Sequence, residues 1–188
     1  VLFLNFSTNL KNSFPGAKLE DFIIYPKDIR DMSKPLKVTI KFSANNLLPQ
    51  ANLPQVFTIP EFSSRFGFIH MILRELSLEQ RKFNYMTSST CAVTEESTLT
   101  LPPQLKVASL PKKLKTSIVN VARLERDITA KNNTLTLKSL TSLDNVEITP
   151  TAYKNLRELT KEIKQSTSLR PIVQLDYSKL SFAELKAA

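Results

Sequence analysis

Cys91 and His70 are the residues of this chain best suited to covalent catalysis, because a cysteine nucleophile needs a base, usually histidine, to take its proton. The chain has 188 residues and one residue of each type. Cys91 stands in a stretch typical of a strand, with no helix N-terminus to activate its thiol. His70 lies among apolar neighbours and has no partner motif. A cysteine hydrolase using Cys91 and His70 is therefore an alternative only, and we predict a non-enzymatic chain without catalytic residues.

Two carboxylate pairs have residue types that could serve as general acid–base groups. Glu95 and Glu96 are adjacent, and on a strand adjacent side chains point to opposite faces. Glu125 and Asp127 share a face, but the arginines at 123 and 126 surround them, which favours surface ion pairing. The sequence has no metal-ligand spacing and no glycine-rich phosphate loop, and its single cysteine excludes an internal disulfide. We therefore predict no metal site and no cofactor.

The basic residues offer a second kind of chemistry. The chain holds 26 lysines and arginines against 17 acidic residues, a net charge of +9, which permits contact with anionic surfaces. The candidate anion-binding residues are the lysines of the densest basic stretch, Lys106, Lys112, Lys113 and Lys115. They lack the interleaved aromatic residues on which bases stack, so a nucleic-acid partner is not expected. An anion- or polyanion-binding module is kept as an alternative function.

These residues must be positioned by strands. The alternation of Leu36, Val38, Ile40 and Phe42 with polar residues has the period of two of a half-buried strand. Two Leu-Pro steps, at 101–102 and 110–111, bracket a short apolar run. We expect a turn at 131–133, where asparagine tolerates positive φ. Further strands are expected at 22–25, 56–59 (short, near an edge), 91–101, 118–129 (with Ile118, Ala122, Leu124 and Ile128 inward), 135–140 and 172–175.

One helix is expected near the C-terminus. Thr149 caps it and Pro150 suits its first position, because the missing N–H of proline would be unpaired there. An apolar stripe follows at spacings of three and four, formed by Tyr153, Leu156, Leu159 and Ile163. Residues 62–76 fit a buried strand or a short helix equally well. The pattern predicts a mostly β fold, an antiparallel β-sandwich (immunoglobulin-like or related) with a C-terminal helix over about 150–165.

Several stretches resemble the closing β region of bacterial transglutaminase-like proteins. They are Asp28–Ile40, Glu79–Phe83, the strand from Thr94 to Leu101 with the Pro102–Pro111 segment that follows, and Ile148–Arg157 with its I-x-P-x-x-Y-x-x-L-R pattern. In that family a domain of unknown function comes first, a papain-like core follows, and a β region closes the chain. The core's cysteine, histidine and aspartate motifs have no counterpart here, and Cys91 matches none of them. The glycine usual between the Leu-Pro steps is also missing.

These features predict one β-sandwich domain over 1–177 and a terminal tail or helical turn over 178–188. Because Val1 precedes the first methionine, Met32, we expect a fragment of a larger protein. Its function is predicted to be that of a non-catalytic accessory domain of a transglutaminase-like or protease-like protein, with the upstream catalytic core or another protein as partner. The opening apolar run is too short for a membrane span. The resemblance also implies a periplasmic or extracellular location.

Overall fold

The computed structural model describes residues 8, 10–11, 14, 16–44, 54–62, 69, 72–73 and 76–180, the side chains of 166–167 excepted. The contacts between residues divide the chain into two compact units, Val1–Gln50 and Ala51–Ala188. The single domain predicted over 1–177 stays a prediction, and residues 181–188 of the predicted tail lie outside the described residues.

Unit 1 is built on an antiparallel hairpin, β1 (Lys18–Tyr25) with β2 (Lys37–Ser43). β1 ends directly before Pro26, as expected from the sequence, because proline cannot extend the ladder. Along β2 the burial alternates strictly, with Val38, Ile40 and Phe42 on the more covered face. The ring of Phe42 stacks on that of Phe14 at 6.2 Å. The predicted half-buried strand is confirmed for Val38, Ile40 and Phe42, whereas Leu36 precedes the strand and is 59% exposed.

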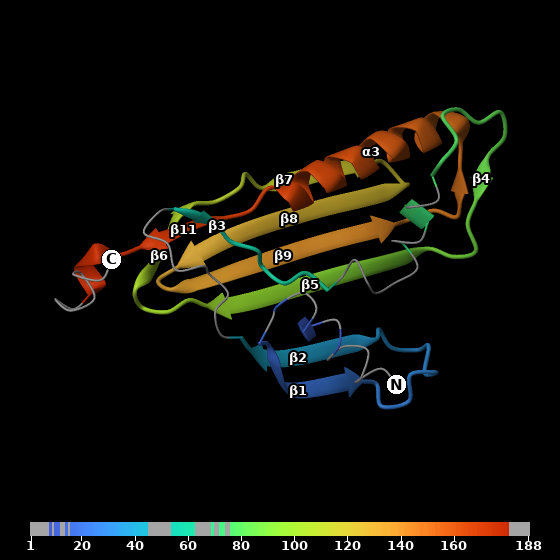
Figure 1. The fold of residues 1–188 in the computed structure, drawn as a ribbon. Coiled ribbons are helices and arrows are strands. Elements are labelled where there is room, and N and C mark those ends of the chain that lie inside the picture. Colours follow the sequence, from blue (N-terminus) through green and yellow to red (C-terminus); the bar gives the residue numbers. More distant parts are fainter. Residues whose placement is uncertain are drawn as a thin grey trace. The chain divides into compact units, whose positions relative to one another are not determined.

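Unit 2 is built on a four-stranded antiparallel sheet in the order β5-β9-β8-β7 (Figure 1). Its strands are β5 (Cys91–Thr100), β7 (Leu114–Ile118), β8 (Ala122–Lys131) and β9 (Thr134–Leu143). β8 and β9 meet at a tight turn in which Asn132 has a φ of 52°, so the predicted turn at 131–133 is confirmed. The return strand buries Leu135 and Leu137 completely.

The single strand predicted over 118–129 is wrong. A turn over 119–121 separates β7 from β8, and Ile118 pairs with Ala122 across it. Asn120 makes the turn possible because it takes a φ of 57°, which asparagine tolerates better than most residues. The inward positions Ala122, Leu124 and Ile128 are buried as predicted, whereas Ile118 belongs to the neighbouring strand.

Helix α3 (Pro150–Ser168) packs on β7 and β8 of this sheet (Figure 1). The Thr149 hydroxyl accepts a hydrogen bond from the Ala152 amide at 3.3 Å, which is the predicted cap. Tyr153, Leu156 and Leu159 are buried, and Ile163 packs against the same core. The predicted helix and its apolar stripe are confirmed.

Two smaller sheets complete unit 2. β6 (Leu105–Ser109) and β3 (Gln55–Val56) flank β11 (Ile172–Leu175), so β3 is an edge strand as expected, although it ends at Val56 and not at residue 59 as predicted. β4 (Tyr85–Met86) pairs with β10 (Glu147–Ile148), and a 3₁₀ turn, η2 (Tyr177–Lys179), follows β11. The fold is mostly β, with several antiparallel sheets and a C-terminal helix, consistent with a β-sandwich-like fold.

Two further expectations concern connecting segments. Ile69, Ile72 and Leu73 are helical, which favours a helix within 62–76, although most of that stretch lies outside the described residues. Pro102 and Pro103 begin a turn in which the Leu105 amide donates to the Pro102 carbonyl at 3.0 Å. Gln104 lies in this turn, at the place where the transglutaminase-like proteins usually have a glycine. No helix among the described residues is both long enough and apolar enough to cross a membrane.

Candidate functional site

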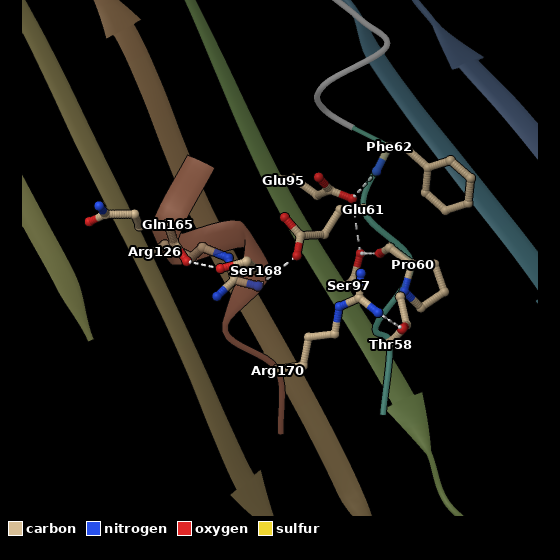
Figure 2. A network of polar contacts seen from close by, with 10 residues as sticks. All are labelled: Thr58, Pro60, Glu61, Phe62, Glu95, Ser97, Arg126, Gln165, Ser168 and Arg170. Atoms are coloured by element: carbon tan, nitrogen blue, oxygen red, sulfur yellow. Dashed lines mark hydrogen bonds and ion pairs between the residues drawn. The ribbon is translucent and has the colours of Figure 1, made fainter. Parts of the chain in front are cut away.

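A network of polar side chains in unit 2 includes a buried arginine on β8 (Figure 2). Arg126 follows Ala122 and Leu124 at the inward positions of that strand and is only 7% exposed. Its Nη2 lies 2.6 Å from Oε1 of Glu61, whose side chain is 24% exposed. The Nε of Arg126 has no hydrogen-bond partner within the described residues. The pair therefore holds a charge inside the sheet's covered face, a costly arrangement that requires both partners.

Two residues of β5 bind the segment that carries Glu61. Oε1 of Glu95 accepts a hydrogen bond from the Phe62 amide at 2.8 Å. The Ser97 hydroxyl lies 3.2 Å from the Pro60 carbonyl and 3.1 Å from Glu95, and it can donate to one of them at a time (Figure 2). Glu95 and Ser97 share the half-buried face of β5, while Glu96 points away and pairs with Lys138. The predicted opposite orientation of Glu95 and Glu96 is confirmed.

The chain around Pro171 binds the same segment from its other end. Nη1 of Arg170 donates to the Thr58 hydroxyl at 2.8 Å, and the Phe57 amide donates to the Pro171 carbonyl at 2.8 Å. Phe57 and Ile59 are 2% and 4% exposed, so the segment buries apolar side chains between its polar contacts. We call residues 57–62 the strap. Contacts from β5, β8 and the start of β11 fix the strap on unit 2.

This arrangement joins the strap to β5 and β8 of the same unit. Glu95, Ser97 and Arg126 each hold the strap through a hydrogen bond or an ion pair. No group of three or more His, Cys, Asp or Glu side chains that could hold a metal ion occurs in the part of the chain that the structure describes. We therefore treat the network as a structural site.

Cys91 opens β5 and packs against the core formed by the sheet and α3. Burial raises the pKa of its thiol, which disfavours the reactive thiolate. His70 lies outside the described residues, so the structure does not test its predicted pairing with Cys91. The predicted place of Cys91 in a strand is confirmed.

The four candidate anion-binding lysines are divided between β6 and the beginning of β7, where Lys115 lies in the strand and Lys112 and Lys113 directly precede it. Lys106 is on β6 and pairs with Asp176 at 3.4 Å. Lys113 and Lys115 lie beside β8 and pair with Asp127 at 3.0 Å and Glu125 at 3.1 Å. Lys112 is exposed. Because three of the four charges are matched by carboxylates, the structure lends the anion-binding prediction no additional support, and it stays a prediction.

The same contacts test the predicted ion pairing of Glu125 and Asp127. Both carboxylates do form surface ion pairs, but with lysines rather than with the arginines beside them. Arg123 instead makes a two-pronged contact with Asp144, which holds the pKa of that carboxyl below its usual value. Arg126 points inward, so its assignment to the surface was wrong. The sequence does carry a signal for this burial. Alternate residues of a strand share a face, so Arg126 lies on the same inward face of β8 as Ala122, Leu124 and Ile128.

Taken together, the fold and the network define a mostly antiparallel β domain in which polar side chains bind the strap to the sheet. Residues 59–173 match the family DUF3858, a domain of unknown function with a solved structure. The match covers more than half of the chain, and the chain therefore belongs to this family. No curated protein matches the sequence.

A solved structure shares the fold. It is the crystal structure of "a putative protease" from Parabacteroides distasonis ATCC 8503, with a TM-score of 0.50 and 18% sequence identity. The similarity covers 65% of this chain and 23% of the Parabacteroides chain. The chain thus spans about a quarter of that protein's length. At this identity the likeness shows the fold alone.

Proposed function

We propose that this chain is a non-catalytic accessory β domain of a larger protease-like or transglutaminase-like protein. The observation that carries the proposal is the fold shared with one portion, 23%, of a much longer chain described as a protease candidate. Membership of a domain family and the resemblance of the strand and helix motifs to the closing β region of transglutaminase-like proteins support it. The catalytic core of the same protein, or another protein, is the proposed partner.

The state of the polar residues supports the non-catalytic part of the proposal. The thiol of Cys91 has a raised pKa and lies in a strand, where no helix dipole activates it. The buried Arg126 is matched by Glu61, and Ser97 contacts a backbone carbonyl and a carboxylate rather than an imidazole. Many transglutaminase-like proteins are exported, which extends the proposal to a periplasmic or extracellular location.

The first experiment asks whether the chain has activity of its own. The purified chain and its Cys91→Ala variant are tested in two assays. Proteolysis is measured with casein that carries self-quenched fluorophores, and transglutaminase activity is measured as incorporation of an amine into a glutamine-containing substrate. We expect no turnover above buffer from either protein, with papain and a transglutaminase as positive controls. Turnover that Cys91→Ala abolishes would overturn the proposal in favour of a cysteine enzyme.

The second experiment addresses the larger protein. The genomic reading frame that contains the codons for residues 59–173 is read in full. We expect it to encode a further domain with a cysteine, a histidine and an aspartate in papain-like order. A reading frame that encodes no further domain would contradict the accessory role, whatever the outcome of the first experiment.

A further inference from the structure

Three large apolar side chains stand exposed in one short stretch of unit 2. Leu78 is 52% exposed, Phe83 is 79% exposed and Met86 is 61% exposed. Single exposed apolar residues are normal on protein surfaces, but several in one stretch of a folded domain indicate an interaction site. The stretch comprises the loop 77–84 and β4, at the end of the sheet where α3 begins (Figure 1).

Contacts of Arg81 and Asn84 fix the stretch to the rest of unit 2. The guanidinium of Arg81 lies 4.9 Å from the ring centre of Tyr85 and 5.2 Å from that of Tyr153 on α3. The Asn84 amide donates to Glu147 at 2.6 Å, beside the β4–β10 ladder. A surface fixed before binding loses little conformational entropy when a partner arrives. The exposed apolar residues are therefore presented in a defined arrangement.

The side of α3 that adjoins this loop is basic. Nη1 of Arg157 donates to the Glu79 carbonyl at 3.0 Å, which identifies the side of the helix that faces the loop. Lys154, Arg157, Lys161 and Lys164 follow one another at spacings of three and four, so they share that side. Glu158 borders it and pairs with Lys161 at 2.8 Å, which leaves Lys154 and Arg157 as the cations nearest the loop. Lys82 adds a positive charge within the loop itself. The apolar residues are thus bordered by cations.

We propose that Leu78, Lys82, Phe83 and Met86, together with Lys154 and Arg157, form a docking surface for an acidic peptide segment of another protein. An apolar side chain of the partner would pack on Phe83 and Met86, and flanking carboxylates would face Lys82 and the basic side of α3. This inference goes beyond the accessory role and does not rest on it, because the surface lies wholly on the described chain.

The charges on this surface favour a protein segment over a membrane. Glu147 lies opposite Met86 in the β4–β10 ladder, and Glu79 belongs to the loop. An anionic bilayer would repel these carboxylates while it attracts the neighbouring cations, so the two effects would oppose each other. A peptide can instead place its carboxylates only where the cations are, as electrostatic complementarity between proteins requires.

A displayed library of random peptides, selected against the immobilised full chain, tests the proposal. We expect the selected peptides to share an aromatic or large aliphatic residue flanked by Asp or Glu. Phe83→Ala should weaken binding of a synthetic selected peptide about thirtyfold, the loss typical of a central interface residue. Val119→Ala is the matched control, because Val119 is equally exposed (82%) on the β7–β8 turn and should leave binding unchanged.

Charge variants and vesicles provide the second arm. Lys82→Glu should weaken peptide binding most at low salt, whereas Lys112→Glu, a control at an exposed lysine elsewhere, should not. Failure to select peptides, selected peptides without acidic residues, or binding that Phe83→Ala leaves intact would each overturn the proposal. Binding to phosphatidylglycerol–phosphatidylcholine vesicles that requires Phe83, without peptide binding, would overturn it in favour of a membrane surface. Circular dichroism confirms that each variant is folded.

Discussion

Removing Glu61 should destabilise unit 2 far more than removing an exposed carboxylate. Glu61→Ala leaves the Arg126 guanidinium, 7% exposed, without its carboxylate. Loss of one partner from a fully buried ion pair costs about 3–5 kcal/mol. Because the Glu61 side chain is 24% exposed, water can partly replace it, and we expect a loss of about 2–3 kcal/mol in the free energy of unfolding.

Urea unfolding of the full chain, followed by far-ultraviolet circular dichroism, measures this loss, since the chain has no tryptophan to report by fluorescence. The matched control is Glu125→Ala, because Glu125 forms an exposed pair with Lys115 at 3.1 Å and should cost no more than about 1 kcal/mol. The double variant Glu61→Leu with Arg126→Met should recover most of the stability, because no buried charge remains unpaired. If Glu61→Ala costs no more than Glu125→Ala, the pair does not secure the strap.

Three further predictions concern the core, a surface carboxylate and the thiol. Leu137→Ala, at a fully buried position of β9, should cost about 2–5 kcal/mol in urea unfolding, and Leu110→Ala, at a 37% exposed position, clearly less. Because Arg123 lowers the pKa of Asp144, their contact stabilises the fold above the unfolded-state pKa of Asp144, and this contribution is lost as the pH falls through the lower folded-state pKa. Carboxyl-carbon NMR should show that pKa rising in Arg123→Ala, and an unchanged value would contradict the contact. Cys91 should react slowly with a disulfide reagent at neutral pH and quickly in urea, because burial raises its pKa, and equal rates would contradict its burial.

The elements with a strong local signal could be predicted from the sequence. The strand over 37–43 and the helix that begins at Pro150 depend on alternation, capping and an apolar stripe, all of which act within a few residues. The break between β7 and β8 has a weaker signal. Asn120 makes that turn without glycine or proline, and the residues on both sides continue to read as one strand.

The strap and its network could be predicted only in part. The inward parity of β8 marks position 126 as buried, but the positive charge of arginine argued for the surface. Its partner Glu61 is 65 residues away, and no local pattern relates the two. The hydrogen bonds from the Phe62 amide to Glu95 and from the Ser97 hydroxyl to the Pro60 carbonyl also join residues far apart in sequence, 33 and 37 positions. Contacts of this kind depend on the tertiary fold, which periodicity does not supply.

Two stretches that carry the resemblance to transglutaminase-like proteins contact each other in the structure. Arg81, from the stretch 79–83, lies against the ring of Tyr153 in the helix motif, and Arg157 of that motif donates to the Glu79 carbonyl. The Tyr153 ring also meets that of Tyr85 edge-on at 5.5 Å. A tyrosine and an arginine four residues apart on one side of a helix can hold such a loop because both side chains reach the same neighbour. Packing contacts therefore account for the tyrosine and the arginine of the motif, and the surface that they support is the one on which Phe83 is exposed.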